Sequence, residues 1–383
     1  MRYRLLVILA LCGFVTSFGA HIVATNLPAY AKGVGVGAFT IGLLIAVYDF
    51  AELFAKPLAG FIADRYGMKR MLLAGLVVFI VGSALFLGIS PRLLLLVRFV
   101  QGLGAAALST VSITLVARHF SGKRGQAFGV YNAIKGGGYV IAPVAGGFLA
   151  QAYGFASIFV VSAAVGVIAL VLSLAVPGDR GSRATLEDDD DMTFSQFLVI
   201  FRDRRLLPVY AVIVLNMFLV GILFGFLPVY LFGIGYSTLQ SGTVVSVGTA
   251  AYLLVQPVAG VLADRIDIRT TVVAGLALAA LTIMAMTFTT GWLLIAAVIL
   301  SGLGIGTVWT NSDALVSALA DSNKLGASIG AAQSFKEFGD MVGPLLVGLI
   351  TQLYGVQAGF IGCGSLALLC VVPLIRSQAL RPA

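Results

Sequence analysis

The sequence predicts an all-α membrane protein with twelve transmembrane helices in two pseudo-symmetric six-helix bundles. First, 60% of its 383 residues are hydrophobic and only 10% are charged. Second, the two halves of the chain repeat at an offset of about 200 residues. Third, the basic residues gather in alternate loops. A soluble core of this length needs less apolar surface, whereas about 20 apolar residues are needed for each crossing of a bilayer core about 30 Å thick.

The repeat relates residues 1–176 to residues 207–376. Leu27-Pro28-Ala29-Tyr30 near the end of the first apolar segment is matched by Leu227-Pro228-Val229-Tyr230 near the end of the seventh. Two halves in the same orientation imply a pseudo-two-fold axis along the membrane normal, an arrangement typical of carriers that rock about a midplane site. Further pairs share the offset: 56–65 with 256–265, and Lys135 and Pro143 with Lys336 and Pro344.

The apolar segments predict helices in order, separated by short polar stretches. The first segment resembles a secretory signal, but it continues to Tyr30 and its repeat partner is internal, so we expect a retained helix. The windows are 5–30, 39–63, 71–90, 92–116, 126–150, 156–176, 207–231, 239–263, 271–290, 292–316, 328–352 and 356–376.

One long polar segment, 177–205, interrupts this series and contains an acidic run, Glu187-Asp188-Asp189-Asp190-Asp191. We interpret the run as a solvated linker. The predicted organisation is therefore an N-terminal six-helix bundle (1–178), a cytoplasmic linker (179–206) and a C-terminal six-helix bundle (207–383).

The net charge of +8 reflects membrane topology. Eighteen of the 24 Lys and Arg lie at the termini or in alternate loops, while the opposite loops hold only Lys32 and Arg92. Cytoplasmic loops carry such an excess. We therefore expect both termini in the cytoplasm, a bacterial plasma (inner) membrane location and no nucleic-acid partner. The eighteen are Arg2, Arg4, Arg65, Lys69, Arg70, Arg118, Lys123, Arg124, Arg180, Arg183, Arg202, Arg204, Arg205, Arg265, Arg269, Lys324, Arg376 and Arg381.

The sequence offers little for catalysis or cofactor binding. Cys12, Cys363 and Cys370 lie inside apolar segments without metal-ligand spacing, so they are expected to pack as small apolar residues. The glycines do not form a phosphate-binding loop, and no nucleophile–base pair stands out. We expect no enzyme activity, no metal and no cofactor.

Three motifs resemble those of the major facilitator superfamily. The first runs from Gly60 to Arg70 and resembles G-x-L-A-D-R-x-G-R-K-x, with Ile62 and Met68 as departures; its second-half copy is weaker because Asp267 replaces a glycine. Residues 98–104 resemble R-x-x-Q-G-x-G. Residues 138–147 resemble G-x-x-x-G-P-x-x-G-G, with Ala142 in place of a glycine.

The resemblance implies twelve helices, alternating access and no covalent chemistry. The third motif (Gly138, Pro143, Gly146, Gly147) is typical of drug/proton antiporters and favours export. The resemblance also implies that Asp64 latches the cytoplasmic side shut against the N-terminal end of helix 11 and the loop Arg118–Arg124, with Asp264 as its weaker counterpart. The latch residues are Gly60, Asp64, Arg65, Gly67, Arg70 and Asp264.

Two helices carry several charges inside the membrane. Asp49, Glu52 and Lys56 share one face of the second helix, roughly 12 to 22 Å deep at about 1.5 Å per residue. On the eleventh helix, Lys336, Glu337 and Asp340 lie about 12 to 18 Å deep. One interpretation is that Glu52–Lys56 and Lys336–Asp340 neutralise each other within each helix. The other is that such pairs open and re-form across the halves as protons bind.

Single polar residues in other helices leave alternatives open. Arg98 cannot lose its proton, so it is either a fixed charge beside a carboxylate or a donor to backbone carbonyls of the first helix. Lys135 contacts either an anionic substrate group or an acid on another helix. His21 is interpreted as a structural hydrogen-bond partner rather than a proton relay. Asp313, near the cytoplasmic end of the tenth helix, is expected to reach water.

These observations predict a secondary active transporter, acting as a monomer in a lipid bilayer on a small-molecule substrate and protons. The leading hypothesis is proton-coupled efflux of small lipophilic molecules or drugs. The alternative is proton-linked uptake of a small metabolite or sugar. A non-transporting receptor or scaffold is the third hypothesis, and the cost of the intramembrane charges argues against it.

Overall fold

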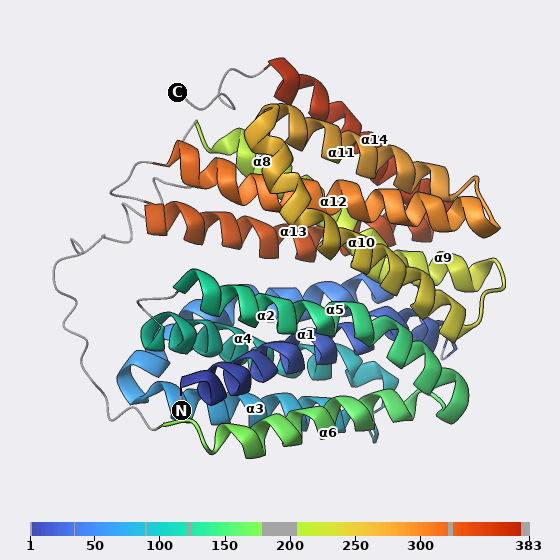
Figure 1. Ribbon diagram of the computed structural model, residues 1–383. Helices are drawn as coiled ribbons and strands as arrows, with labels where there is room; N and C mark the ends of the chain where they lie inside the picture. The colour runs from blue at the N-terminus through green and yellow to red at the C-terminus, as the bar shows by residue number, and fades with distance from the viewer. Residues whose placement is uncertain are drawn as a thin grey trace. The chain divides into compact units, whose positions relative to one another are not determined.

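The computed structural model describes residues 2–33, 35–88, 90–120, 124–177, 205–320 and 325–376, and these residues form helices without any strand. The first half contributes six long helices (Figure 1). They are α1 (Arg2–Gly33), α2 (Ala38–Tyr66), α3 (Met68–Leu85), α4 (Leu94–His119), α5 (Arg124–Tyr153) and α6 (Ala156–Ser173), with a short 3-10 turn, η1 (Pro91–Leu93), before α4.

The second half contributes six more helical segments within the described residues. The seventh is compound, because a π-helical stretch, η3 (Ile222–Phe226), joins α8 (Leu207–Gly221) to α9 (Leu227–Gly233). The others are α10 (Thr238–Arg265), α11 (Ile268–Met286), α12 (Gly291–Leu319), α13 (Leu325–Tyr354) and α14 (Val356–Arg376). The predicted all-α fold with twelve helices is confirmed.

Within the part of the chain that the structure describes, ten helices are long and apolar enough to cross a membrane, and α14 adds a shorter apolar stretch, Val356–Val371. The remaining helix, α13, is thirty residues long but carries Lys336, Glu337 and Asp340 in its middle. This protein is therefore an integral, multi-pass membrane protein.

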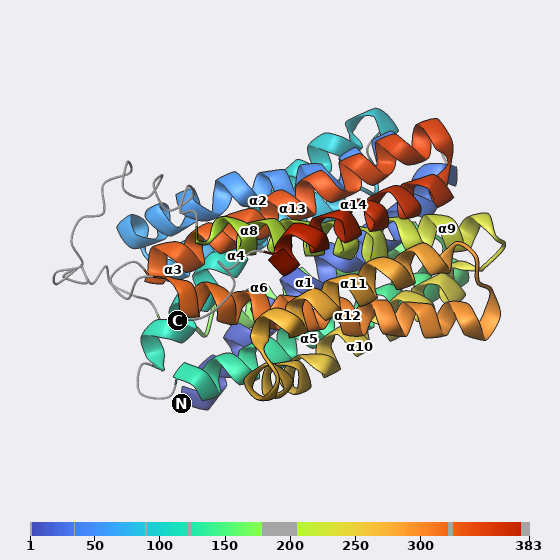
Figure 2. The same cartoon turned by 90° about the horizontal axis from the view of Figure 1, so that it is seen from above.

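The chain divides into two compact units. Unit 1 comprises Met1–Thr185 with Leu231–Ser246, and unit 2 comprises Leu186–Tyr230 with Val247–Ala383. The helices within each unit run side by side along their length (Figure 1 and Figure 2). The first turns of α10 thus belong to unit 1 and its remainder to unit 2. The domain boundaries expected from the sequence stay a prediction.

The two halves pack their helices in the same pattern. In the first, α1 packs on α4, α5 and α6, and α3 packs on α4 and α6; in the second, α8 packs on α12, α13 and α14, and α11 packs on α12 and α14. Buried leucine, alanine and aromatic side chains of α1, α3, α4 and α5 form the core of unit 1. The sequence repeat is therefore a repeat of helix contacts.

Glycines at matched positions allow these helices to approach closely. A Cβ on Gly104 would lie 2.5 Å from the Phe79 nitrogen, and one on Gly304 would lie 2.7 Å from the Ala279 nitrogen. A Cβ on Gly102 would likewise clash with the Tyr48 carbonyl oxygen, and one on Gly302 would clash with the Gly248 carbonyl oxygen. Small residues are favoured at helix contacts in lipid because they permit this approach. The equivalent positions differ by 200, the offset found in the sequence.

In the described chain, helix ends differ from the predicted windows by up to five residues, and one segment contains a π-helical stretch that the sequence did not predict. The third helix ends at Leu85, before the predicted 90, because the chain turns at Phe86–Gly88. The π-helical stretch Ile222–Phe226 has no counterpart in α1, which is α-helical throughout. A change of hydrogen-bond register leaves no trace in the apolar pattern, so the sequence could not reveal it.

Candidate functional site

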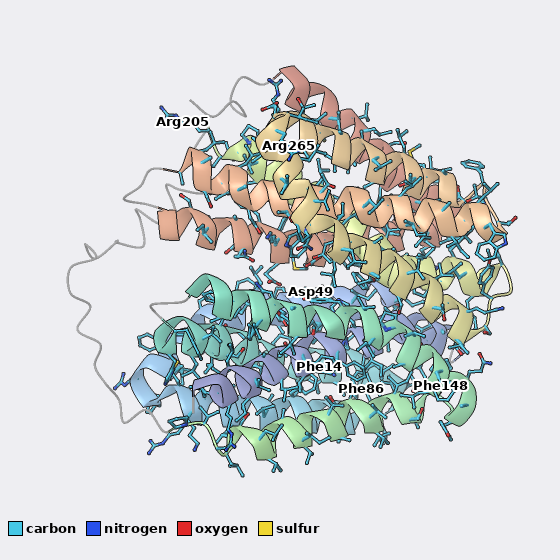
Figure 3. The ribbon with its side chains drawn as sticks, in the orientation of Figure 1. Phe14, Asp49, Phe86, Phe148, Arg205 and Arg265 are labelled. Atoms are coloured by element: carbon cyan, nitrogen blue, oxygen red, sulfur yellow. The ribbon has the colours of Figure 1, made fainter. Side chains whose placement is uncertain are left out.

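The charges predicted on the second helix lie together on α2. Lys56 Nζ is 2.5 Å from Glu52 Oε2, one helical turn away, and both side chains are mostly buried. This pair is the intrahelical one that the sequence suggested. Asp49 lies one turn earlier on α2 and is labelled in Figure 3. A helical spacing of three and four residues places all three on one face.

Arg98 of α4 is buried at 1% exposure and lies next to these charges. Its Nε donates to the Leu44 carbonyl of α2 (3.2 Å), and a terminal nitrogen donates to Gln101 Oε1 (2.8 Å). The guanidinium carbon lies 4.5 Å from the centre of the Tyr48 ring. The carbonyl that Arg98 binds thus lies on α2, whereas one of the two sequence interpretations placed it on the first helix.

The Arg98 contacts continue as a hydrogen-bonded chain into the bundle. Gln101 Nε2 donates to Ser83 Oγ (3.1 Å), and Ser83 shares a further hydrogen bond with Ser162 on α6 (3.1 Å). All four side chains are buried. A buried charge needs such partners, because an unsatisfied polar group in a low-dielectric interior is costly.

Arg98 also interacts electrostatically with the carboxylates of α2. Asp49, Glu52 and Tyr48 are its charged or titratable neighbours, and the Tyr48 hydroxyl is hydrogen-bonded to Glu52. Arg98 stays protonated at any physiological pH, so it is a fixed positive charge beside carboxylates that can titrate. The other interpretation of Arg98 from the sequence, a fixed charge near an acid, agrees with this arrangement.

α1 and α5 complete this group of residues in unit 1. His21 Nδ1 is 2.9 Å from the Ser17 carbonyl, and its ring meets Tyr139 of α5 edge-on at 4.4 Å. Lys135, half-buried on α5, is close enough to His21 to influence it electrostatically, as are Arg98 and Glu52. We name the set His21, Tyr48, Asp49, Glu52, Lys56, Arg98 and Lys135 the α2–α4 charge cluster.

The glycine motif of α5 forms close helix contacts. A Cβ on Gly138 would lie 2.9 Å from the Phe18 nitrogen of α1, and Gly146 faces Asn26 and Ile22 of the same helix. Within unit 1, Gly147 meets the backbone of Thr238, and Gly242 meets the backbone of Pro143. The motif is thus a packing surface on both α1 and the start of α10.

In unit 2, Lys336 of α13 pairs with Asp313 of α12. Its Nζ donates to both carboxylate oxygens, at 2.7 and 2.8 Å, and lies 4.4 Å from the centre of the Trp309 ring. Glu337 and Asp340 follow on α13 and have interactions of their own. The sequence suggested Asp340 as the partner of Lys336, because helical spacing shows only neighbours on one helix.

The latch residues occupy the α2–α3 corner and the end of α10. Gly67 has φ of 102°, which favours glycine, and Arg65 and Arg70 are exposed. A Cβ on Gly60 would lie 3.7 Å from the Thr110 side chain, an ordinary contact distance. Asp64 and Asp264 lie in the last turns of α2 and α10, and their side chains fall outside the described residues, as does the loop at Lys123.

Sequence reasoning gave no role to Tyr48, Gln101 and Trp309, and it expected Asp313 to reach water without pairing it with Lys336; the Asp313 side chain is 44% exposed. Tyr48 and Gln101 hold Arg98, while Trp309 and Asp313 hold Lys336. Tyr48 directly precedes Asp49, and Gln101 is part of the R-x-x-Q motif, so both had a signal in the sequence. The spacing of Trp309 and Asp313, one helical turn, was the available signal for the second pair.

Two repeated six-helix bundles with ion pairs inside apolar helices define a membrane transporter. Comparison with known proteins gives the same result and specifies the family. The profile of the Major Facilitator Superfamily matches residues 9–251 and 233–382. The chain belongs to the Major Facilitator Superfamily.

Similar proteins include several named for drug resistance. The chain is 26% identical to multidrug resistance protein MdtG of Citrobacter koseri over 364 residues, which is 91% of this chain and 88% of that protein. It is 28% identical to quinolone resistance protein NorA of Staphylococcus aureus over 174 residues, 45% of each chain.

Solved structures share the fold. A variant of nucleoside transporter NupG has a TM-score of 0.83 at 13% identity, covering 97% of this chain and 99% of that one. A bacterial homologue of the human lysosomal transporter Spinster, inward-facing and unoccupied, has a TM-score of 0.82 at 15% identity, covering 99% and 96%. Identities this low establish the fold alone.

Proposed function

We propose that this transporter exports small lipophilic molecules in exchange for protons, by alternating access in a bacterial plasma membrane with both termini in the cytoplasm. The observation that carries the proposal is the α2–α4 charge cluster, where titratable carboxylates lie beside a guanidinium that cannot titrate. The relatives named for multidrug and quinolone resistance support the export direction. The bilayer is its environment, and a single chain suffices.

Proton binding would act on the pairs of this cluster. Protonation of Glu52 removes the charge that holds Lys56 at 2.5 Å and weakens the hydrogen bond with the Tyr48 hydroxyl. The positive charges of Arg98 and Lys56 are then balanced by one carboxylate fewer on α2. A rearrangement of α2 against α4 follows, because buried charges need partners. Asp49 is the second candidate carrier of the proton.

The latch residues and the glycine motif of α5 would couple proton binding at Glu52 to the opening of one side of the membrane or the other. Asp64 closes the cytoplasmic side in this proposal, with Asp264 in the equivalent position of the second half. Close contacts join the last turns of α5 to the first turns of α10: Gly147 with Thr238, and Pro143 with Gly242. In this proposal they keep the non-cytoplasmic side closed and so prevent a proton leak. Glu337 and Asp340 would supply further charges on α13.

Inside-out membrane vesicles test the proposal. An imposed gradient, acidic inside, should drive a lipophilic fluorescent dye into vesicles that contain the protein, without ATP. Glu52→Gln should abolish gradient-driven accumulation while leaving dye exchange at equal pH intact, because only proton release is lost. Asp267→Asn is the matched control, since Asp267 caps α11 through Thr270, a role asparagine also fills.

Two results would defeat the proposal. One is accumulation that persists when both Asp49 and Glu52 are neutralised, since the proton site would then lie elsewhere. The other is accumulation confined to right-side-out vesicles, which would indicate uptake of the substrate.

A further inference from the structure

The side chain of Lys336 is held by two residues of α12. Its exposure is 4%, and its ammonium donates to both oxygens of Asp313 and lies over the Trp309 ring. Tyr252 of α10 meets Trp309 edge-on, with ring centres 5.7 Å apart. We name Tyr252, Trp309, Asp313 and Lys336 the Lys336 cluster; all four belong to unit 2.

The repeated fold does not require this cluster. At the offset of 200, Ser109 and Ile113 occupy the positions of Trp309 and Asp313. Lys336 corresponds to Lys135, whose helix packs in the same way without an acid on α4 at that position. Burying an ammonium costs free energy that apolar packing would avoid. The second half therefore retains the pair for a purpose other than helix packing.

The two partners of the ion pair differ in exposure. The Asp313 side chain is 44% exposed, whereas that of Lys336 is 5% exposed. Asp313 is therefore the accessible partner of the pair, while the Lys336 ammonium is buried and needs a partner. A carboxylate from outside can take the place of Asp313 on the ammonium. The half-buried Trp309 ring lies directly beside that position, and the buried Tyr252 ring supports it from α10.

We propose that the Lys336 cluster is a binding subsite for aromatic carboxylates. The ligand carboxylate replaces Asp313 on Lys336, and the ligand ring lies against Trp309. This inference rests on the proposed function, since it names one chemical class among the substrates of the transporter.

Tryptophan fluorescence gives a direct test. The chain has two tryptophans, and Trp292 is 85% exposed, so Trp292→Phe leaves Trp309 as the single reporter. Three quenchers share one ring and differ in charge: 4-nitrobenzoate, methyl 4-nitrobenzoate and 4-nitrobenzylammonium. In full-length protein in nanodiscs at pH 7, 4-nitrobenzoate should quench with saturation, and the ester and the ammonium compound should not saturate in the same range.

Two variants should change affinity in opposite directions. Lys336→Gln should weaken 4-nitrobenzoate binding at least about tenfold, because a hydrogen bond to a charged group is lost. Asp313→Asn should strengthen binding, because the competing carboxylate is gone and Lys336 remains charged. Lys336→Arg keeps the charge and should retain saturable binding. Retained binding in this variant would show that Lys336→Gln loses binding through the lost charge and not through misfolding.

Three results would overturn the inference. Equal quenching by the ester and the acid, unchanged in Lys336→Gln, would indicate an apolar surface alone. Tighter binding of the ammonium compound, lost in Asp313→Asn, would make the cluster a cation site. If none of the three compounds quenches with saturation, the Lys336 cluster is not a binding site for them. None of these results would alter dye export in the vesicle assay, so the proposed function is tested separately.

Discussion

At the residue scale, the described chain buries two cations by different means. Arg98 is satisfied by a carbonyl, an amide oxygen and an aromatic ring, with carboxylates further away. Lys336 is satisfied by both oxygens of one carboxylate and an aromatic ring. A guanidinium offers several donors in a fixed plane, so it can join two helices, whereas an ammonium is a compact point charge. The first arrangement is suited to a fixed charge and the second to an exchangeable partner.

Replacing Arg98 by lysine should therefore destabilise the protein despite keeping the charge. An ammonium lacks the planar fork that joins Leu44 and Gln101, so the hydrogen bond to Gln101 Oε1 is lost, at a cost of about 1.5–3 kcal/mol for a hydrogen bond to a charged group. The apparent melting temperature in detergent should fall for Arg98→Lys. It should stay unchanged for Arg92→Lys, because Arg92 is exposed. Equal melting temperatures of Arg98→Lys and the wild type would show that the hydrogen bonds of Arg98 contribute nothing measurable.

At the element scale, the sequence predicted helices well and contacts between them poorly. Apolar runs and their polar borders placed the twelve segments, because burial in lipid requires long uninterrupted helices. The pair Glu52–Lys56 was also predictable, since it lies within one helix. The pairing of Lys336 with Asp313 depends on how α12 and α13 rotate against each other, which no single-helix spacing records. The π-helical stretch was missed for a similar reason, because it changes hydrogen bonds without changing composition.

Neighbouring glycines of α5 should respond oppositely to alanine. A Cβ on Gly137 meets nothing within 4 Å, so Gly137→Ala should stabilise by about 0.5–1 kcal/mol through helix preference alone. A Cβ on Gly138 would lie 2.9 Å from the Phe18 nitrogen and 3.1 Å from the Phe14 oxygen, so Gly138→Ala must push α1 and α5 apart. Its melting temperature and dye export should both fall. Matching behaviour of the two variants would mean that the α1–α5 contact is looser than these distances indicate.

At the scale of the whole molecule, the main helix contacts are repeated in the two halves, whereas the charged residues are not. Gly102 and Gly104 have counterparts at Gly302 and Gly304 with the same neighbours. The charged residues are not repeated, because Arg98 corresponds to Val298 and Asp313 corresponds to Ile113. Contacts between backbones must be kept in both halves for each bundle to pack. Charged groups are free to differ, and the two proposals use this difference by placing proton binding in the first half and a ligand carboxylate in the second.

The orientation of the whole chain in the membrane follows from the basic loops. If they are cytoplasmic, position 190 lies inside and position 290, directly before α12, lies outside. We would replace the native cysteines by alanine and introduce Asp190→Cys or Thr290→Cys. A membrane-impermeant maleimide added to intact cells should label position 290, whose side chain is exposed, and label position 190 only after the cells are permeabilised. Labelling of position 190 in intact cells would invert the topology, and with it the side from which substrate enters an exporter.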